Sequence, residues 1–304
     1  MKSLSDITYD QCPACGSAKI RKELTTRDFT VSNEEFEVWE CTTCRLRFTQ
    51  HVPGMMDIGK FYQSENYISH TETSKGFINR IYHIVRKRTL TGKRKLINSQ
   101  IKKNSHANPY KILDIGAGTG AFVSHMKEHG WMATGLEPDP EARKKARELY
   151  DVELLPAEEL QNQAANSFDV ITLWHVLEHV HDLHNYLDRL KNITKPGGII
   201  LIAVPNYTSF DGGHYREFWA AYDVPRHLYH FSPQSMRQLL EKHSLQLDSI
   251  HPMWFDSFYI SMLSEKYKTA STNLLSSSII ATISNLKTLF RTENCSSLVY
   301  VVKS

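Results

Sequence analysis

Short apolar runs and segments with helical spacing alternate along the chain from residue 109 onwards. Runs at residues 112–115, 169–174 and 198–204 are mostly apolar, as in strands that are covered on both faces. Helix-forming segments lie between them, at residues 122–129 and 141–150. This alternation predicts a parallel sheet with helices on both of its faces.

Further strands are expected from the same pattern towards the C-terminus. The full set covers residues 112–115, 132–136, 153–155, 169–174, 198–204, 247–250 and 298–302. Residues 256–292 form a long insertion before the last of these strands. Insertions of this length often serve as lids or partner surfaces.

A glycine-rich turn follows the first strand. Residues 111–120 read KILDIGAGTG, with glycine at every second position from Gly116. A sharp turn and the close approach of a ligand to the backbone both favour glycine there. The second strand ends in Glu137, where dinucleotide-type folds place the acid that binds ribose hydroxyls. Because ligands bind at the carboxyl ends of parallel strands, the ends at Gly116, Glu137, Ala157 and Trp174 are expected to converge on one crevice.

Four of the five cysteines form two C-x-x-C pairs, Cys12 with Cys15 and Cys41 with Cys44. Each pair can place two thiolates on one tetrahedral metal, so two pairs complete a four-sulfur site. Such a closed site predicts a structural Zn²⁺ in a zinc ribbon, with no open position for catalysis. A redox C-x-x-C is the alternative, and the matched second pair argues against it.

Four motifs follow one another along the predicted sheet. They are LDIGAGTG at residues 113–120, GLEPD at 135–139, SFDVI at 167–171, and the segment from residue 190 that ends in KPGG at 195–198. In this order they resemble class I S-adenosylmethionine-dependent methyltransferases of the small-molecule type, over residues 109–250. The resemblance implies an α/β, Rossmann-like sheet of seven strands, mostly parallel with the last strand antiparallel. It also implies S-adenosylmethionine as cofactor and S-adenosylhomocysteine as product.

The resemblance further implies which residues bind the cofactor. Asp114 and the glycines would hold its methionine part, and Glu137 its ribose. In related enzymes a tyrosine-rich segment before the first motif lies over the cofactor, which indicates Tyr62 and Tyr67; packing between ribbon and core is the alternative for this pair. The full set is Asp114, Gly116, Ala117, Gly118, Gly120, Glu137, Pro138, Ala157, Glu158, Trp174, His175, Tyr62 and Tyr67.

A histidine-containing run, YDVPRHLYHFSP at residues 222–233, follows the fifth strand. It resembles a run found in bacterial small-molecule methyltransferases, which build part of their acceptor pocket at this point. Arg226 would hold an acidic acceptor by a bidentate contact, and His227 would accept a proton as methyl transfer proceeds. The alternative is a structural turn in which these side chains bond to the backbone.

A second histidine-containing run, HVLEH, occupies residues 175–179. It fits a zinc-peptidase pattern in which His175 and His179 would share one face of a helix. Its position directly after a strand of the motif series argues instead that His175 and Glu178 line the cofactor or acceptor pocket. His175 is therefore a third candidate catalytic residue, beside Arg226 and His227. An ordinary surface location of these histidines is the remaining alternative.

Composition and charge restrict the classes of partner. The formal net charge is +3, which is too small to indicate nucleic-acid binding. No uninterrupted apolar run approaches the ~20 residues that span a bilayer. The N-terminus has no apolar signal-peptide core, so a cytoplasmic location without a membrane partner is expected.

Three segments and one preferred function follow. A zinc ribbon is expected at residues 1–50, a helical and aromatic connecting segment at 51–108, and the methyltransferase domain at 109–304. The preferred function is methyl transfer to a small-molecule acceptor. A nucleotide-linked sugar is one candidate, because a similar ribbon precedes the domain in sugar C-methyltransferases, although this chain lacks their additional C-terminal domain.

Two alternatives to this function stay open. One is an RNA methyltransferase that uses the ribbon and the basic residues at 80–103 to bind phosphates. For those residues, the solvated face of a helix is the simpler interpretation. The other alternative is a non-catalytic module that binds the cofactor.

Overall fold

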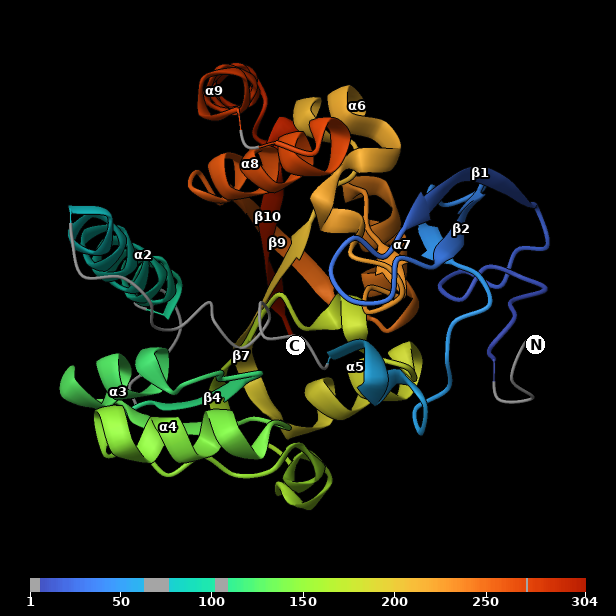
Figure 1. Cartoon of the computed structure of the whole chain (residues 1–304). Helices are drawn as coiled ribbons and strands as arrows, with labels where there is room; N and C mark the ends of the chain where they lie inside the picture. The colour runs from blue at the N-terminus through green and yellow to red at the C-terminus, as the bar shows by residue number, and fades with distance from the viewer. Residues whose placement is uncertain (1–5, 63–76, 102–108, 272) are drawn as a thin grey trace. The chain divides into compact units, whose positions relative to one another are not determined.

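The structure is a computed structural model of the 304-residue chain, and it describes residues 6–62, 77–101, 109–271 and 273–304 (Figure 1). Contacts divide the chain into two compact units. The first unit consists of Met1–Ile68, Leu177–His184 and Ala203–Tyr300. The second unit consists of Ser69–Val176, Asn185–Ile202 and Val301–Ser304. Within the described residues, no helix is long and apolar enough to cross a membrane.

The main sheet has six strands in the order β5-β4-β6-β7-β10-β9. Their bounds are β4 (Lys111–Ile115), β5 (Met132–Leu136), β6 (Phe168–Trp174), β7 (Thr194–Pro205), β9 (Gln246–Pro252) and β10 (Ser297–Lys303). β4 pairs in parallel with both β5 and β6. The sheet is thus the mostly parallel, Rossmann-like α/β arrangement that the sequence predicts.

β10 runs antiparallel to β7. The N–H of Ser304 donates to the carbonyl of Gly198, and the N–H of Asn206 donates to the carbonyl of Ser296. The partner on β10 therefore moves towards the N-terminus as β7 advances, which defines an antiparallel pair. The expected third strand at residues 153–155 is reduced to a single parallel bridge, Leu136 with Leu155.

The second unit holds the glycine-rich turn. Its helices are α2 (Phe77–Ile101), α3 (Ala121–Glu128), α4 (Pro140–Tyr150) and most of α5 (Leu183–Ile193). α3 contacts β5 and buries Phe122, Val123 and Met126. α4 begins at an N-cap, Asp139, whose side chain accepts the N–H of Glu141, with Pro140 in the first turn. This cap fixes where α4 begins, and so it positions the loop between β5 and α4.

The first unit contains a four-stranded sheet in the order β1-β2-β3-β8. Its strands are β1 (Ile20–Arg27), β2 (Glu35–Cys41), β3 (Arg47–Thr49) and β8 (Tyr229–His230). β3 pairs with β8 through Phe48 and Tyr229. The cysteine-containing segment therefore shares a sheet with residues far along the chain, and the compact units do not follow the expected boundaries at residues 50 and 108.

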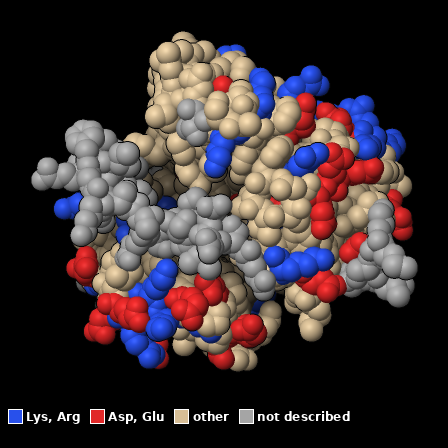
Figure 2. Space-filling view, in the orientation of Figure 1, with Lys and Arg blue, Asp and Glu red and all other residues tan. Residues whose placement is uncertain are grey.

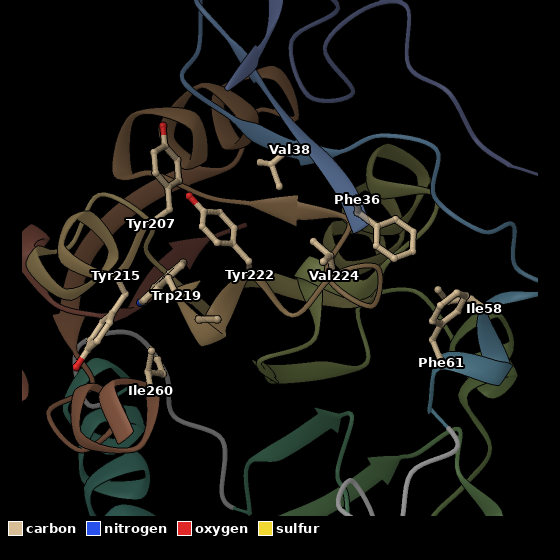
Figure 3. Close-up of a cluster of buried hydrophobic side chains, with 11 residues drawn as sticks. Phe36, Val38, Ile58, Phe61, Tyr207, Tyr215, Trp219, Tyr222, Val224 and Ile260 are labelled. Carbon is tan, nitrogen blue, oxygen red and sulfur yellow. The ribbon is translucent and has the colours of Figure 1, made fainter. Parts of the chain in front are cut away.

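A buried aromatic cluster explains this arrangement (Figure 3). It joins β2, the 3-10 helix η1 (Ile58–Tyr62) and the segment after β7. Phe36 from β2 and Phe61 from η1 contact edge to face, with ring centroids 5.9 Å apart. Trp219 and Tyr222 form a second such pair at 5.3 Å. Burial of these large side chains stabilises the first unit as one body.

The insertion at residues 256–292 is helical. It forms α8 (Asp256–Thr269) and α9 (Leu274–Phe290), which pack against each other and against α6 (Phe210–Tyr215). α7 (Pro233–Lys242) lies between β8 and β9 in the sequence and begins at the capping box of Ser232 and Ser235. A lid role for the insertion stays a prediction.

Candidate functional site

The glycine-rich turn of the second unit leaves an open face at Gly118. Gly116 and Gly118 have φ of 70° and 56°, in the left-handed region that favours glycine. The N–H groups of Gly116 and Ala117 donate to the carbonyl of Leu136, at 2.8 and 2.9 Å. A Cβ placed on Gly118 would meet no atom within 4 Å, whereas one on Gly116 would lie 2.5 Å from Val176. The turn is thus anchored to β5 and can admit a ligand at Gly118.

The carboxylate of Glu137 faces this turn. Its Oε2 accepts the N–H of Gly118 at 2.7 Å, and its Oε1 accepts the N–H of Asp139 at 3.0 Å. The side chain is buried, and burial raises the pKa of Glu137 above its usual value, against the effect of these two hydrogen bonds. The acid is therefore held in one orientation at the ends of β4 and β5.

Asp114 lies near the C-terminal end of β4, and its side chain is buried. Its Oδ1 accepts the hydroxyl of Thr172 from β6 at 2.6 Å. Burial raises the pKa of Asp114 to about 7. The hydrogen bond from Thr172 and the charge of Lys93 act in the opposite direction but are weaker than the effect of burial. A cationic group bound beside Asp114 would favour its ionised form.

Trp174 at the end of β6 offers an unused donor. Its indole Nε1 is buried and has no hydrogen-bond acceptor in the part of the chain that the structure describes. Phe122 contacts the indole edge to face, with centroids 5.7 Å apart. A buried N–H of this kind is expected to bind a ligand group. With the open Gly118 and the two acids, it makes the second unit fit a nucleoside that carries an amino acid.

Lys93 from α2 is a neighbour that the sequence analysis missed. Its Nζ lies 4.0 Å from the centroid of the Trp174 ring, a cation–π contact. Arg86 donates to the Thr119 hydroxyl at 3.4 Å, and Arg94 donates to His125 at 3.3 Å. Three cations of α2 therefore contact other segments of the same unit. The sequence alone could not single them out, because the face of α2 that meets the rest of the unit follows only from the position of the helix.

The other expected cofactor residues lie in different surroundings. Pro138 and Glu158 are exposed, and Ala157 is half-buried at the start of the 3-10 helix η3 (Ala157–Asn162). Gly120 is buried against Ala146. Tyr67 lies outside the described residues, and Tyr62 belongs to the first unit, where its hydroxyl is 3.1 Å from Nδ1 of His179.

The run at residues 175–179 is not one helix. His175 has a φ of 59°, and only Leu177–His179 form a turn of 3-10 helix. His175 and His179 therefore do not share a helix face, and the zinc-peptidase interpretation is wrong on geometry. His175 belongs to the second unit, where it follows Trp174.

Three side chains meet in the first unit: Glu178, His179 and His227. Their ligand atoms lie within 4.8 Å of one another. The Nδ1 atom of His179 lies 3.0 Å from the carbonyl oxygen of Arg226. The Nδ1 atom of His227 lies 2.9 Å from the carbonyl oxygen of Ala221. Because a carbonyl only accepts, each Nδ1 carries a proton and donates this bond. Burial lowers the pKa of His179 to about 4, helped by the charge of His227.

The guanidinium group of Arg226 is hydrogen-bonded to other residues of the protein. Its side chain is fully buried, and its Nη2 donates to Asp28 at 2.9 Å and to Asp223 at 2.6 Å. Its Nη1 donates to the carbonyl of Phe61 at 2.8 Å. The geometry therefore favours the structural alternative for Arg226 over a contact with an acidic acceptor, because a ligand would have to displace a buried carboxylate.

The four paired cysteines of the first unit come together. Their sulfur atoms lie within 4.8 Å of one another, with Cys12 3.5 Å from Cys44 and Cys15 3.7 Å from Cys41. Zn–S bonds of about 2.3 Å in a tetrahedron place sulfur atoms about 3.8 Å apart. The donor set and its spacing therefore fit Zn²⁺ and are compatible with a zinc ribbon.

Comparison with known proteins defines the class. A family model described as "Methyltransferase domain" matches residues 85–250, which is more than half of the chain. The chain belongs to this family of methyltransferase domains. Membership supports S-adenosylmethionine as the cofactor, in agreement with the fit of the second unit.

Two curated relatives are O-methyltransferases of ubiquinone biosynthesis. The mitochondrial protein of Homo sapiens is 27% identical over 164 residues, which cover 49% of this chain and 44% of that protein. The protein of Pasteurella multocida (strain Pm70) is 36% identical over 114 residues, which cover 32% of this chain and 47% of that protein. The chain spans less than half the length of these relatives.

Solved structures with a similar fold include an S-adenosylmethionine-dependent methyltransferase from Archaeoglobus fulgidus. It has a TM-score of 0.45 at 20% identity, with 73% of this chain and all of that chain covered. A putative sarcosine dimethylglycine methyltransferase from Galdieria sulphuraria has a TM-score of 0.49 at 13% identity, with 74% and 87% covered.

Proposed function

We propose that this protein transfers the methyl group of S-adenosylmethionine to a small-molecule acceptor. The observation that supports this most is the contact between Glu137 and the N–H of Gly118, beside a position that is open to a ligand. It unites the two sequence motifs that bind nucleosides in folds of this type.

In this proposal, three residues of the second unit bind different parts of the cofactor. Glu137 binds ribose hydroxyls, and Asp114 binds the methionine amino group. The indole N–H of Trp174 donates to a ligand oxygen or nitrogen. The bound cofactor supplies a methyl group that its sulfonium has already activated. The protein therefore has to orient the acceptor and, for a hydroxyl or carbon acceptor, remove a proton.

We assign the proton-accepting role to His227. Its Nδ1–H bonds to Ala221, so Nε2 is the basic atom, and it lies 3.9 Å from Oδ2 of Asp223. The side chain is buried except for 11% of its surface.

For the acceptor we propose a nucleotide-linked sugar. Support comes from the four-cysteine cluster ahead of the domain, which resembles the arrangement in sugar C-methyltransferases. The relatives named for ubiquinone biosynthesis support oxygen as an alternative acceptor atom.

The first experiment is native mass spectrometry with and without S-adenosylhomocysteine, followed by methyl transfer from labelled S-adenosylmethionine. The proposal expects one nucleoside bound per chain and label in a sugar fraction when nucleotide-sugars are supplied. Failure to bind the nucleoside at any concentration would refute cofactor use. Binding without transfer to any metabolite or RNA pool would indicate a non-catalytic module.

His227→Gln tests the base. Turnover should fall by roughly 10²- to 10⁴-fold while S-adenosylhomocysteine affinity stays unchanged. His251→Gln is the matched control. His251 lies in the same unit, and its ring is hydrogen-bonded to Ser249, two residues away on the same strand. Wild-type turnover of His227→Gln across pH would show that another group accepts the proton.

A further inference from the structure

Large apolar side chains are concentrated on the surface of α8 and α9. Of the fourteen exposed large apolar residues that the described chain contains, ten lie between residues 254 and 290. On α9, Leu275, Leu289 and Phe290 are 74%, 68% and 92% exposed. Trp254, Phe255 and Phe258, at the start of α8, are also exposed. Figure 2 shows mostly uncharged atoms over these two helices.

The two helices pack with small side chains instead of large ones. The buried face of α9 is formed by Ser277, Ala281, Ser284 and Thr288. α8 buries Ser257, Ser261 and Ser264 beside one isoleucine and Glu265. Within this interface, the hydroxyl of Ser257 donates to Asn285 at 3.1 Å. Behind it, the hydroxyl of Ser284 donates to Asp211 at 2.7 Å.

This distribution is the reverse of that in an ordinary surface helix. In water, a helix normally buries its large apolar stripe and exposes its polar one. In lipid, helices associate through small residues and hydroxyl hydrogen bonds, and their large apolar side chains face outwards. The pattern of α9 is therefore the one that a lipid environment favours.

The fully exposed charges on α8 and α9 are positive, whereas Asp256 in the first turn of α8 is half-buried. Lys287 is the single charged residue of α9, and Lys266 and Lys268 are exposed at the end of α8. Of the neighbouring acids, Glu265 is buried and accepts the hydroxyl of Tyr215, and Glu293 is paired with arginines. Basic residues beside an apolar helix face match the anionic headgroups of a membrane.

We propose that α8 and α9 form a docking surface for an anionic lipid membrane. α9 has 17 residues, so it is about 25 Å long, which is shorter than a bilayer core of about 30 Å. It would lie in the headgroup region with Leu275, Leu289 and Phe290 inserted. A second copy of the chain could also cover the apolar side chains, but it would bring its own lysines to the same contact and repel them.

Vesicle flotation of the full-length protein tests the proposal. The probes are phosphatidylcholine vesicles with and without phosphatidylglycerol. The protein should float with the anionic vesicles and bind them less tightly as salt rises. The triple variant Leu275→Ser, Leu289→Ser, Phe290→Ser should bind at least about ten-fold more weakly, because three inserted side chains are lost.

The chain offers a matched control. Met55 and Met56 are 71% and 94% exposed and belong to the same unit, but they lie outside α8 and α9. Met55→Ser with Met56→Ser should bind vesicles like the wild type. Circular dichroism, melting temperature and zinc content should be unchanged in both variants, because exposed side chains contribute little to folding.

Two further measurements separate insertion from simple charge attraction. Lys266→Glu with Lys268→Glu should weaken binding to anionic vesicles only. Lipids with quenchers in the upper acyl chain should quench tryptophan fluorescence in the wild type, and Trp254→Phe should lose part of that quenching.

Three results would overturn the proposal. The first is absence of vesicle binding by the wild-type protein. The second is equal vesicle binding by the triple variant. The third is self-association without lipid that the triple variant abolishes, in a protein that does not float, which would identify a second copy as the occupant.

Discussion

Glu137 accepts the main-chain N–H of Gly118 at 2.7 Å. The bond connects the residue after β5 to the turn after β4, so one carboxylate both fixes the turn and faces the position where a Cβ would meet nothing. Its other oxygen is held by the N–H of Asp139. The carboxylate is therefore oriented before a ligand arrives, which lowers the entropic cost of binding.

Glu137→Gln removes the charge and keeps the size of the side chain. S-adenosylhomocysteine affinity should fall by about ten- to a hundred-fold, since hydrogen bonds to a charged group contribute about 1.5–3 kcal/mol. Isothermal titration calorimetry measures this loss. Glu153→Gln, which removes an exposed partner of Arg147, should leave the affinity unchanged. Equal affinities for both variants would show that Glu137 does not contact the ligand.

Asp114 should make ligand binding depend on pH. Burial raises the pKa of Asp114 to about 7, so below that value the free protein holds a proton on this group. A cationic amino group binds the ionised form, so the proton must be lost on binding at low pH. S-adenosylhomocysteine affinity should therefore rise as pH increases through about 7. Asp114→Asn should remove this dependence; its persistence in the variant would assign it to another group.

The cysteine cluster should bind one zinc per chain. Cys41→Ser removes one of four ligands at the end of β2, so the variant should lose zinc and melt at a lower temperature than the wild type. Metal analysis and differential scanning calorimetry measure both. Cys295→Ser changes a buried cysteine outside the cluster and should retain the zinc. A Cys41→Ser protein with full zinc content would contradict the four-sulfur site.

Arg226 should matter for stability. Arg226→Met leaves Asp28 and Asp223 without their shared cation, which should lower the free energy of unfolding by roughly 3–5 kcal/mol. Arg237→Met, which breaks an exposed pair with Glu293, should cost less than about 1 kcal/mol. Urea unfolding measures both. A stable Arg226→Met protein that no longer binds acceptor would restore the acceptor-binding role.

The same ion pairs predict acid sensitivity. Burial alone would raise the pKa of Asp28 and of Asp223. Arg226, together with the N–H groups of Ser32 and Thr30 at Asp28, holds both pKa values below their usual range. A depressed pKa contributes stability at neutral pH that is lost as pH falls below the ordinary range of the acid. The stability difference between wild type and Arg226→Met should therefore shrink in acid.

The sequence by itself determined the alternation of strands and helices, the glycine turn with Glu137, and the two cysteine pairs. These features are local: side-chain periodicity, backbone freedom at Gly118 and ligand spacing act within a few residues. Family membership follows from the same ordered motifs, and the model match over residues 85–250 confirms it.

Tertiary structure decided what no local pattern contains. Arg226 is paired with Asp28, which lies 198 residues earlier in the chain. The run at residues 222–233 therefore cannot show that Arg226 has a buried partner. Lys93 joins Trp174 only through the position of α2. The outward leucines of α9 are recognised only when the structure shows that its serines are the buried face. Burial and long-range pairing depend on which segments meet, and that is set by the packing of the whole chain.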